Sequence, residues 1–482
     1  MRARLFTPEN RKWWTLVAVA FGLFMIMLDN TVVNVALPSI QRDLGTDLSE
    51  LQWIVTGYAL TFAALMLTGG KLADLLGRRL IFVVGLAVFT LASLACGLAE
   101  SSDFLIGARI VQGAGAALMN PATLSIIAAT FPPAQRGTAI GIWAGVSALA
   151  LAIGPLVGGL LTQHIDWSWI FFVNIPVGIL AIAASFAFID ESRDTSEVQR
   201  LDFPGLFTSA VGLFSLTYAL IEANTYGWTS GRIVAAFAVA AVSLTAFVLL
   251  ELRQKVPMLD LSLFRNGTFA GANLVVLLVA LAMFGVFFFV SLYMQNILGF
   301  SAVQTGAAFL PMTVLIILIA PIAGRATDRF GSRWLMTVGM TLVGLQLLYF
   351  SRLEVDSTFW NLLPGFLVGG LGMALTMTPS AAAAVRAVPV DKSGVGSAVL
   401  NAFRQVGGSI GIALMGAIMA AQLTEPPTTA SFMDGFEHAL LVAAGIAVAG
   451  AAVAAVLIRP HDTTAEPEGR AAVPAEAVGH VS

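Results

Sequence analysis

Long apolar stretches follow one another along nearly the whole chain, and this pattern constrains the fold more than any other feature. A membrane-spanning helix needs about 20 mostly apolar residues, and the 482-residue sequence contains fourteen stretches of that kind. They cover residues 13–38, 51–70, 79–98, 104–129, 137–162, 169–189, 203–222, 232–251, 268–296, 303–324, 333–350, 360–382, 394–421 and 436–458. Because lipid offers the backbone no hydrogen-bonding partners, such stretches form helices. We therefore predict an all-α polytopic membrane protein with fourteen transmembrane helices.

The composition agrees with a lipid environment. Hydrophobic residues make up 58% of the chain and charged residues 11%, whereas about 25% of the residues of soluble domains are charged. A soluble enzyme or binding module is therefore excluded. A net charge of -3 provides no basic surface, so we expect no nucleic-acid partner. Because no metal cluster, phosphate-binding loop or nucleophile–base set can be assembled, we expect neither an enzyme nor a bound cofactor.

The basic residues predict the orientation of the chain in the membrane. If the N-terminus is cytoplasmic, about 20 of the 25 Lys and Arg residues fall in cytoplasmic segments, which is the bias that the positive-inside rule describes. The first apolar run, from Trp13 to Pro38, is too long for a signal-peptide core, so we expect it to be retained as the first span. Both termini are then predicted to be cytoplasmic.

A ten-residue motif occurs twice. GKLADLLGRR (Gly70 to Arg79) and GRATDRFGSR (Gly324 to Arg333) both follow the pattern G-x-x-x-D-x-x-G-x-R in loops on the same side. They are 254 residues apart, whereas six spans with their loops take roughly 200 residues. The difference matches the spans 203–222 and 232–251. The pattern predicts six helices, two extra helices and six helices, and duplicated halves are typical of secondary transporters with a site near the midplane.

The repeat gives a domain organisation. We expect a cytoplasmic N-terminus, two six-helix bundles separated by linkers and two extra transmembrane helices, and a disordered cytoplasmic tail. In chain order these regions are residues 1–12, 13–189, 190–267, 268–458 and 459–482.

Six motifs lie on or between these spans in a definite order. They are LDNTVVNVALP (Leu28 to Pro38), GKLADLLGRR, RIVQGAGAALMNPA (Arg109 to Ala122), GVSALALAIGPLVGG (Gly145 to Gly159), WSWIFFVNIPVG (Trp167 to Gly178) and LNAFRQVGGSIGIAL (Leu400 to Leu414). Together they make the chain resemble the major facilitator superfamily, and in particular its 14-span drug:proton antiporter branch. Leu75, Ala150 and Ser168 depart from that branch's usual residues.

The resemblance implies a function. A protein of this branch exports amphipathic, hydrophobic drugs or metabolites across the bacterial cytoplasmic membrane by alternating access, and the proton gradient is its only energy source. The expected partners are small hydrophobic or cationic substrates and membrane lipid. We expect a monomer, with adaptor proteins as an open alternative.

Two charged residues are candidates for proton coupling. Asp29 is the only acidic residue well inside a predicted span, and hydrocarbon favours the neutral form of a carboxyl group. At 1.5 Å per residue, Asp29 and Arg109 lie about 13 Å and about 8 Å inside the outer ends of their spans, so they can meet. The resemblance links this Arg to proton movement. The alternative is a permanent ion pair that only fixes helix packing.

A third charge, Arg404, is predicted to lie near the midplane. Asn401, Arg404 and Gln405 share one helix face with Gly408, and that face must look at a cavity or a polar partner and not at lipid. Arg404 could bind an anionic group of the substrate, or it could hold the two halves together. The sequence favours neither.

Polar, aromatic and Met side chains on the expected cavity helices are candidates for substrate contact, because Met and aromatic groups adapt to varied apolar ligands. Lipid-facing packing is the alternative for part of this set. The candidates are Asn34, Tyr58, Gln112, Asn120, Asn273, Phe284, Phe288, Tyr293, Met373, Met377, Asn401, Arg404 and Gln405.

Gating is expected at two kinds of position. Small residues of the fifth span permit close helix packing, and the resemblance implies that this packing closes one side of the exporter. The two loop motifs are expected to form latches, with Asp74 paired to Arg78 or Arg136, although ordinary loop capping is the alternative. The gating candidates are Gly70, Asp74, Gly77, Arg78, Arg136, Gly154, Pro155, Gly158, Gly159, Asp328, Arg329 and Arg333.

Two rival functions remain open at this point. The first keeps the fold and narrows the substrate to one secondary metabolite or to a lipid such as a lysophospholipid. The second is a non-transporting membrane receptor or scaffold, which would explain the helices but not Asp29, Arg109 and the paired motifs together.

Overall fold

A computed structural model of the chain describes residues 8–193, 201–254, 257–388, 393–424 and 428–459. Within these ranges the regular elements are helices, and they form fourteen spans that are long and apolar enough to cross a membrane. The predicted all-α fold with fourteen spans is therefore confirmed. Most of the predicted N-terminal segment 1–12 and of the predicted tail 459–482 lies outside the described residues.

The helices form two groups and an inserted pair. The first group comprises α2 (Pro8–Leu44), α3 (Leu48–Leu76), α4 (Arg78–Gly97), α5 (Ser102–Thr130), α6 (Pro133–His164), α7 (Trp169–Phe172) and α8 (Asn174–Phe188). The inserted pair is α9 (Phe203–Tyr226) and α10 (Gly231–Arg253). The second group comprises η1 (Leu261–Arg265), α11 (Gly267–Leu292), η2 (Tyr293–Ile297), α12 (Ala302–Ala308), α13 (Leu310–Phe330), α14 (Ser332–Phe350), α15 (Phe359–Arg386), α16 (Ser393–Ala420) and α17 (Thr429–Leu457).

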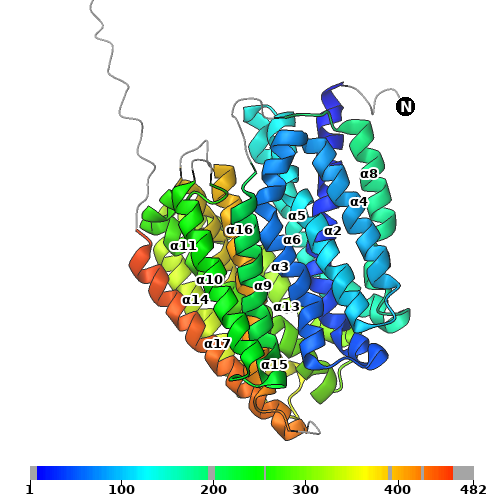
Figure 1. Cartoon of the computed structure of the whole chain (residues 1–482), viewed down its shortest axis with the longest axis vertical. Coiled ribbons are helices and arrows are strands. Elements are labelled where there is room, and N and C mark those ends of the chain that lie inside the picture. Colours follow the sequence, from blue (N-terminus) through cyan, green and yellow to red (C-terminus); the bar gives the residue numbers. More distant parts are fainter. Residues whose placement is uncertain (1–7, 194–200, 255–256, 389–392, 425–427, 460–482) are drawn as a thin grey trace, which may run out of the picture.

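The inserted pair touches both groups through α9. Figure 1 shows α9 and α10, in green, lying across the place where the two groups meet. Helix α9 packs against α3 of the first group and α16 of the second. Trp53 Nε1 donates a hydrogen bond to Glu222 Oε1 at 3.2 Å, and Asn224 Nδ2 donates one to the Ala417 carbonyl at 2.6 Å. Helix α9 therefore bridges the two groups. Helix α10 is much more exposed, because only 11% of its 18-residue apolar stretch is buried.

The described ends of the chain define two sides of the molecule. An even number of spans separates the two described ends of the chain, so both lie on one side of the helix array. We call this the terminal side, and the other the opposite side. The Asp74 and Asp328 motifs lie on the terminal side, because each follows a span that runs toward it.

Several helix boundaries differ from the sequence prediction. Helix α2 continues through Pro38 to Leu44, because one proline removes a single backbone hydrogen bond and does not end a long packed helix. The span predicted at 303–324 is divided at Phe309 into α12 and α13. Pro311 lies in the first turn of α13, where an amide N–H would have no partner within the helix.

A long-range contact fixes the turn between α3 and α4. Gly77 has φ +126°, a region that disfavours any residue with a Cβ atom. The Glu191 carboxylate, which follows α8, accepts hydrogen bonds from the Arg79 and Leu80 amides at 3.1 Å each. It thus caps the N-terminus of α4, where the helix dipole favours a negative charge.

Glycines bring α5 into close contact with its neighbours. The position of a Cβ atom on Gly113 is occupied by the Tyr58 carbonyl of α3, and that on Gly115 lies 2.6 Å from the Phe89 amide nitrogen of α4. Close backbone approach of this kind strengthens van der Waals contact between helices in membranes.

Replacing Gly113 by Ala should therefore destabilise the fold. The added methyl group overlaps the Tyr58 backbone, and overpacking of this kind costs about 1–3 kcal/mol. We expect a lower Tm for Gly113→Ala in detergent, measured by intrinsic fluorescence. Gly107→Ala is the matched control, because Gly107 lies on the same helix with no atom within 4 Å of its Cβ position. Equal Tm values for the two variants would contradict the close packing.

Candidate functional site

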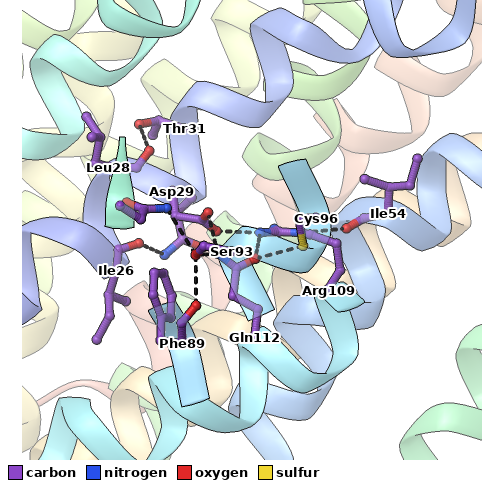
Figure 2. Close-up of polar contacts among 12 residues, drawn as sticks. Ile26, Leu28, Asp29, Thr31, Ile54, Phe89, Ser93, Cys96, Arg109 and Gln112 are labelled. Carbon is purple, nitrogen blue, oxygen red and sulfur yellow. Dashed lines mark hydrogen bonds and ion pairs between the residues drawn. The ribbon is translucent and has the colours of Figure 1, made fainter. Parts of the chain in front are cut away.

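Asp29 and Arg109 form a buried ion pair. Arg109 Nη1 lies 2.5 Å from Asp29 Oδ2, and the two side chains are 1% and 0% exposed. Asp29 lies two residues from the middle of the span Asn10–Leu44. Figure 2 shows that the pair joins α2 to α5 in the interior of the first group.

Gln112 connects the two charges a second time. Its Oε1 accepts a hydrogen bond from Arg109 Nη1 at 2.6 Å, and its Nε2 donates one to Asp29 Oδ1 at 2.9 Å (Figure 2). Arg109 and Gln112 are three residues apart on α5, so they lie on one helix face. The amide can do both because it carries a donor and an acceptor on one end group.

Arg109 is also stabilised without Asp29. Its Nε donates to the Ile54 carbonyl at 3.0 Å, and the guanidinium carbon lies 4.2 Å from the centre of the Tyr58 ring. A cation over an aromatic face is electrostatically favourable. Protonation of Asp29 would therefore leave Arg109 with a carbonyl, the Gln112 oxygen and the Tyr58 ring.

Sequence reasoning missed several residues of this cluster. Ser93 Oγ accepts from Gln112 Nε2 at 2.8 Å and donates to the Phe89 carbonyl, and Asn174 Nδ2 approaches it at 3.4 Å. The Cys96 thiol lies 3.7 Å from Gln112 Oε1. Their only signal in the sequence was a polar side chain inside an apolar span, which many helices in membranes carry for packing alone.

Five of the predicted cavity residues have buried polar atoms without a hydrogen-bond partner. These atoms are Asn34 Oδ1, Tyr58 Oη, Asn273 Oδ1, Arg404 Nε and Gln405 Nε2. They lie on α2, α3, α11 and α16, and the contacts between the two helix groups include α2 with α11 and α3 with α16. Because an unpaired buried polar atom is unfavourable, each of these atoms is a candidate contact for a polar group of a ligand.

Arg404 differs from Arg109 in lacking a carboxylate. Within the described ranges no Asp or Glu forms an ion pair with it, although it lies close to the middle of the span Val395–Ala420. Neighbouring Gln405 is 2% exposed, and its side-chain amide also lacks an acceptor. Helix α16 thus presents two buried donor groups that no acceptor satisfies.

The other cavity candidates lie in more ordinary surroundings. Asn401 donates to the Ser397 carbonyl of its own helix at 3.1 Å, and Asn120 is 7% exposed. The Phe284 ring lies against Gly408, and the Phe288 ring packs edge-on against Phe289. Three others belong to the packed core: Tyr293, Met373 and Met377. Tyr293 stacks on Phe436 and donates to the Glu354 carbonyl on the opposite side of the molecule, away from Asn401 and Arg404.

The glycines of α6 divide that helix into two halves. Toward the opposite side, Gly154 lies against Thr31, Gly158 against Val32 of α2, and Gly159 against Ala302 of α12. Pro155 there approaches Gly306 of α12. Toward the terminal side, the Cβ positions of Gly141 and Gly145 have no atom within 4 Å. Among the glycines described on α6, Gly154, Gly158 and Gly159 therefore pack closely, whereas Gly141 and Gly145 do not.

Hydrogen bonds also join the two groups on the opposite side. Ser291 Oγ donates to the Asn34 carbonyl at 2.8 Å, and Gln295 Nε2 donates to the Val35 carbonyl at 2.9 Å. These bonds connect the far ends of α2 and α11–η2. Together with the α6 contacts, they close the opposite side between the two groups.

The two copies of the repeated motif form different local contacts. Asp74 forms an ion pair of 2.9 Å with Arg78, while Arg136 donates to the Phe131 carbonyl. Gly70, the first residue of this motif, packs against Pro121. In the second copy Asp328 pairs with Arg386 at the end of α15. Arg329 and Arg333 lie over the rings of the residues that follow them, Phe330 and Trp334.

The described part of the chain contains no group of three His, Cys, Asp or Glu side chains that could hold a metal ion. The polar groups of the site are the carboxylate of Asp29, the guanidinium groups of Arg109 and Arg404, and side-chain amides.

The Major Facilitator Superfamily is the family whose sequence model matches, over residues 19–411 and 272–480. The puromycin resistance protein of Streptomyces alboniger is 38% identical over 480 residues, which cover 97% of this chain and 95% of that protein. The tetracenomycin C resistance and export protein of Streptomyces glaucescens is 37% identical, over 86% of this chain and 77% of that protein. The multidrug resistance protein Stp of Mycobacterium tuberculosis (strain CDC 1551 / Oshkosh) is 37% identical, over 85% of this chain and 76% of that protein.

Solved structures share the fold at low sequence identity. A bacterial homologue of the human lysosomal transporter Spinster, in an inward-facing and unoccupied conformation, superposes with a TM-score of 0.67 at 16% identity, over 94% of this chain and 98% of that one. An autoinhibited peptide transporter of the POT family gives a TM-score of 0.66 at 14% identity, over 94% and 97% of the two chains.

The ion pair should be energetically coupled. Asp29→Asn leaves a buried charge unpaired, and breaking such a pair costs about 3–5 kcal/mol, less here because Arg109 keeps other partners. We expect Asp29→Asn and Arg109→Gln each to lower the Tm, and the double variant to be more stable than the sum of the single effects predicts. A thermal double-mutant cycle in detergent measures this. Additive effects would show that the two side chains do not interact.

Proposed function

This chain belongs to the Major Facilitator Superfamily, and from that premise we propose that it exports amphipathic small molecules in exchange for protons. It is a multi-pass membrane transporter related to bacterial drug and antibiotic export proteins, and not an enzyme. In the proposal, the terminal side faces the cytoplasm, and the helix groups α2–α8 and α11–α17 act as two bundles that rock around a central site.

The observation that carries the proposal is the buried Asp29 carboxylate and its partners. A proton carrier must exist in a charged and a neutral form, and both forms need a stable environment. When charged, Asp29 accepts from Arg109 and Gln112. When it is neutral, Arg109 keeps the Ile54 carbonyl, Gln112 and the Tyr58 ring. In this mechanism Arg109 favours release of the proton by stabilising the carboxylate.

The arrangement of contacts supports alternating access. Closure between Asn34 and Ser291, and between α6 and α12, lies on the opposite side. The α6 glycines toward the terminal side have no close neighbour. We assign this arrangement to the cytoplasm-facing state. In the opposite state, the half of α6 around Gly141 and Gly145 packs against the second bundle, and the Asp74 motif becomes a latch across the interface.

The unsatisfied polar atoms of Asn34, Tyr58, Asn273, Arg404 and Gln405 support a substrate site between the bundles. A mostly apolar site with a few polar atoms is complementary to a ligand that carries a few hydrogen-bonding groups on an apolar body. Arg404 is proposed to contact an acceptor group of the substrate, because its Nε is buried without an acceptor and no Asp or Glu of the described residues pairs with it. This role extends the substrate range beyond the neutral and cationic molecules expected from the resemblance.

A narrower function is supported by the names of some relatives. The proteins from Streptomyces glaucescens and Streptomyces alboniger are named for resistance to single compounds, whereas Stp is named for multidrug resistance. A dedicated exporter of one metabolite is therefore the second candidate. A thermal-shift panel of structurally unrelated antibiotics separates the two, because a multidrug exporter responds to many compounds and a dedicated exporter to one.

Proton coupling is tested by transport in proteoliposomes with an imposed pH gradient. We expect the wild type to accumulate ethidium or puromycin against its concentration gradient. Asp29→Asn should abolish this accumulation, because it cannot exchange a proton, while downhill equilibration continues. Asp103→Asn, an exposed residue of α5, is the control and should transport like the wild type. Undiminished accumulation by Asp29→Asn would remove Asp29 from the proton role.

The role of Arg404 is tested with three probes that share one apolar body: 1-pyrenebutyrate, its neutral amide and pyrenebutyl-trimethylammonium. Loss of a charge-assisted hydrogen bond costs about 1.5–3 kcal/mol, so Arg404→Gln should weaken binding of the carboxylate about tenfold or more. Binding of the neutral probe should change little. Arg352→Gln, exposed between α14 and α15, is the control. An unchanged affinity of Arg404→Gln for the carboxylate excludes the contact, whether or not the protein transports.

A further inference from the structure

Two acidic side chains meet at the terminal-side end of the inserted helix pair, far from Asp29 in the chain. Asp202 is the N-cap residue of α9, and Glu251 lies in the last turn of α10. Both residues are more than nine-tenths buried, with exposed fractions of 7% and 3%. Neither has a role in the transport mechanism proposed above.

One oxygen of each carboxyl group is satisfied by N–H donors. Asp202 Oδ1 accepts from the Gly205 amide and from Gln254 Nε2, at 2.8 Å each. Glu251 Oε2 accepts from the Leu259 amide at 2.9 Å. Asp202 therefore receives two donors on a single oxygen, while Glu251 receives one.

The other two oxygens face each other without a donor. Asp202 Oδ2 and Glu251 Oε1 are buried and lack a hydrogen-bond partner. Both lie next to Gly205, at the position that a Cβ atom of this residue would occupy. Glu251 Oε1 is 2.6 Å from that position, and Asp202 Oδ2 is closer still. The two carboxyl oxygens therefore converge on one point. Two carboxylates this close, with no donor between them, repel each other unless one is protonated.

Among the described residues, no charged group replaces that proton. Lys71 of α3 acts on Glu251 through space, but neither carboxyl group forms an ion pair within the described residues. Arg253, two residues after Glu251 on α10, is exposed, and residues two apart on a helix do not face each other. Burial acts to raise the pKa of Asp202, but the hydrogen bonds, first of all those from the Gly205 amide and Gln254, outweigh it, so its pKa lies below the ordinary value. Asp202 accepts from two N–H donors and Glu251 from one, so Asp202 is the member that is better stabilised as a carboxylate.

We propose that Asp202 and Glu251 form a proton-binding site in which Glu251 Oε1 carries one proton and donates it to Asp202 Oδ2. The proton satisfies both orphan oxygens and leaves the pair with a single negative charge. This site is separate from the Asp29 cluster. It lies at the terminal-side ends of α9 and α10, where the pH of the terminal-side compartment acts on it.

The shared proton holds the segment that joins the inserted pair to the second helix group. Gln254 and Leu259 both bond to the pair, and the Thr68 hydroxyl of α3 contacts the Met258 sulfur at 3.5 Å. Leu259 and Leu263 then pack into the cluster of Phe269 and Val399. Loss of the proton places two negative charges in contact and weakens this connection. The strength of the connection between the inserted helices and the second helix group therefore depends on pH.

Infrared difference spectroscopy of the full-length protein in detergent tests the proposal directly. A protonated carboxyl group has a carbonyl band that carboxylates lack, and we expect one at neutral pH in the wild type. Glu251→Gln and Asp202→Asn should each remove the Glu251 band, because either amide can donate to the remaining carboxylate and make the proton unnecessary. Asp356→Asn, an exposed carboxyl, and Asp29→Asn should both retain it. Retention of the full band in both Glu251→Gln and Asp202→Asn overturns the proposal.

Thermal unfolding gives a second readout. The folded pair holds a proton that an unfolded Glu, with a pKa of about 4.3, releases. The free energy of unfolding should then fall as pH rises above that value and through deprotonation of the pair. Glu251→Gln should lose this fall, while Asp356→Asn keeps it. An equal pH dependence in Glu251→Gln and the wild type contradicts the proposal. So does stabilisation of the wild type at high pH by added Na⁺ or Ca²⁺, which would mark a cation site.

Discussion

The absence of water in the membrane interior is the constraint from which the rest of this structure follows. It forces the backbone into helices, because each amide must find its partner within its own segment. It also makes every buried charge and polar atom significant, because an unpaired one is costly. The chain contains three solutions to this problem: a fully bonded ion pair at Asp29 and Arg109, a cation without a carboxylate at Arg404, and two carboxyl groups in contact at Asp202 and Glu251.

The three places differ in which bonding partner their buried polar groups still lack. The Asp29 cluster satisfies itself in the described arrangement and keeps acceptors for Arg109 if Asp29 becomes neutral. Arg404 and Gln405 keep donors that no protein acceptor meets, so a ligand is the missing partner in our proposal. The Asp202–Glu251 pair lacks only a proton. The proposed proton carrier, substrate contact and pH-dependent connection thus follow from one rule, the cost of an unpaired buried polar group, applied at three positions.

Helix packing decides which of these groups can respond to motion. Glycines in the half of α6 toward the opposite side let it approach α2 and α12, while Gly141 and Gly145 remain without close neighbours. The ion-pair cluster lies wholly within the first helix group, whereas the unsatisfied polar atoms lie on helices of both groups. Rocking of one group against the other would therefore rearrange the proposed substrate site directly, and reach Asp29 only through α2, α3 and α5.

The sequence by itself determined the number and type of the spans and the family, and it predicted that Asp29 and Arg109 can meet, because apolar length and a charge inside lipid are local signals. It could not place Ser93, Asn174 or the Ile54 carbonyl beside them, since a polar side chain in an apolar span has many uses. Nor could it show that Asp202 and Glu251, which are 49 residues apart, meet at Gly205. Only the tertiary structure decided that, because contact between distant segments depends on how α9 and α10 pack, and their individual apolar patterns do not specify it.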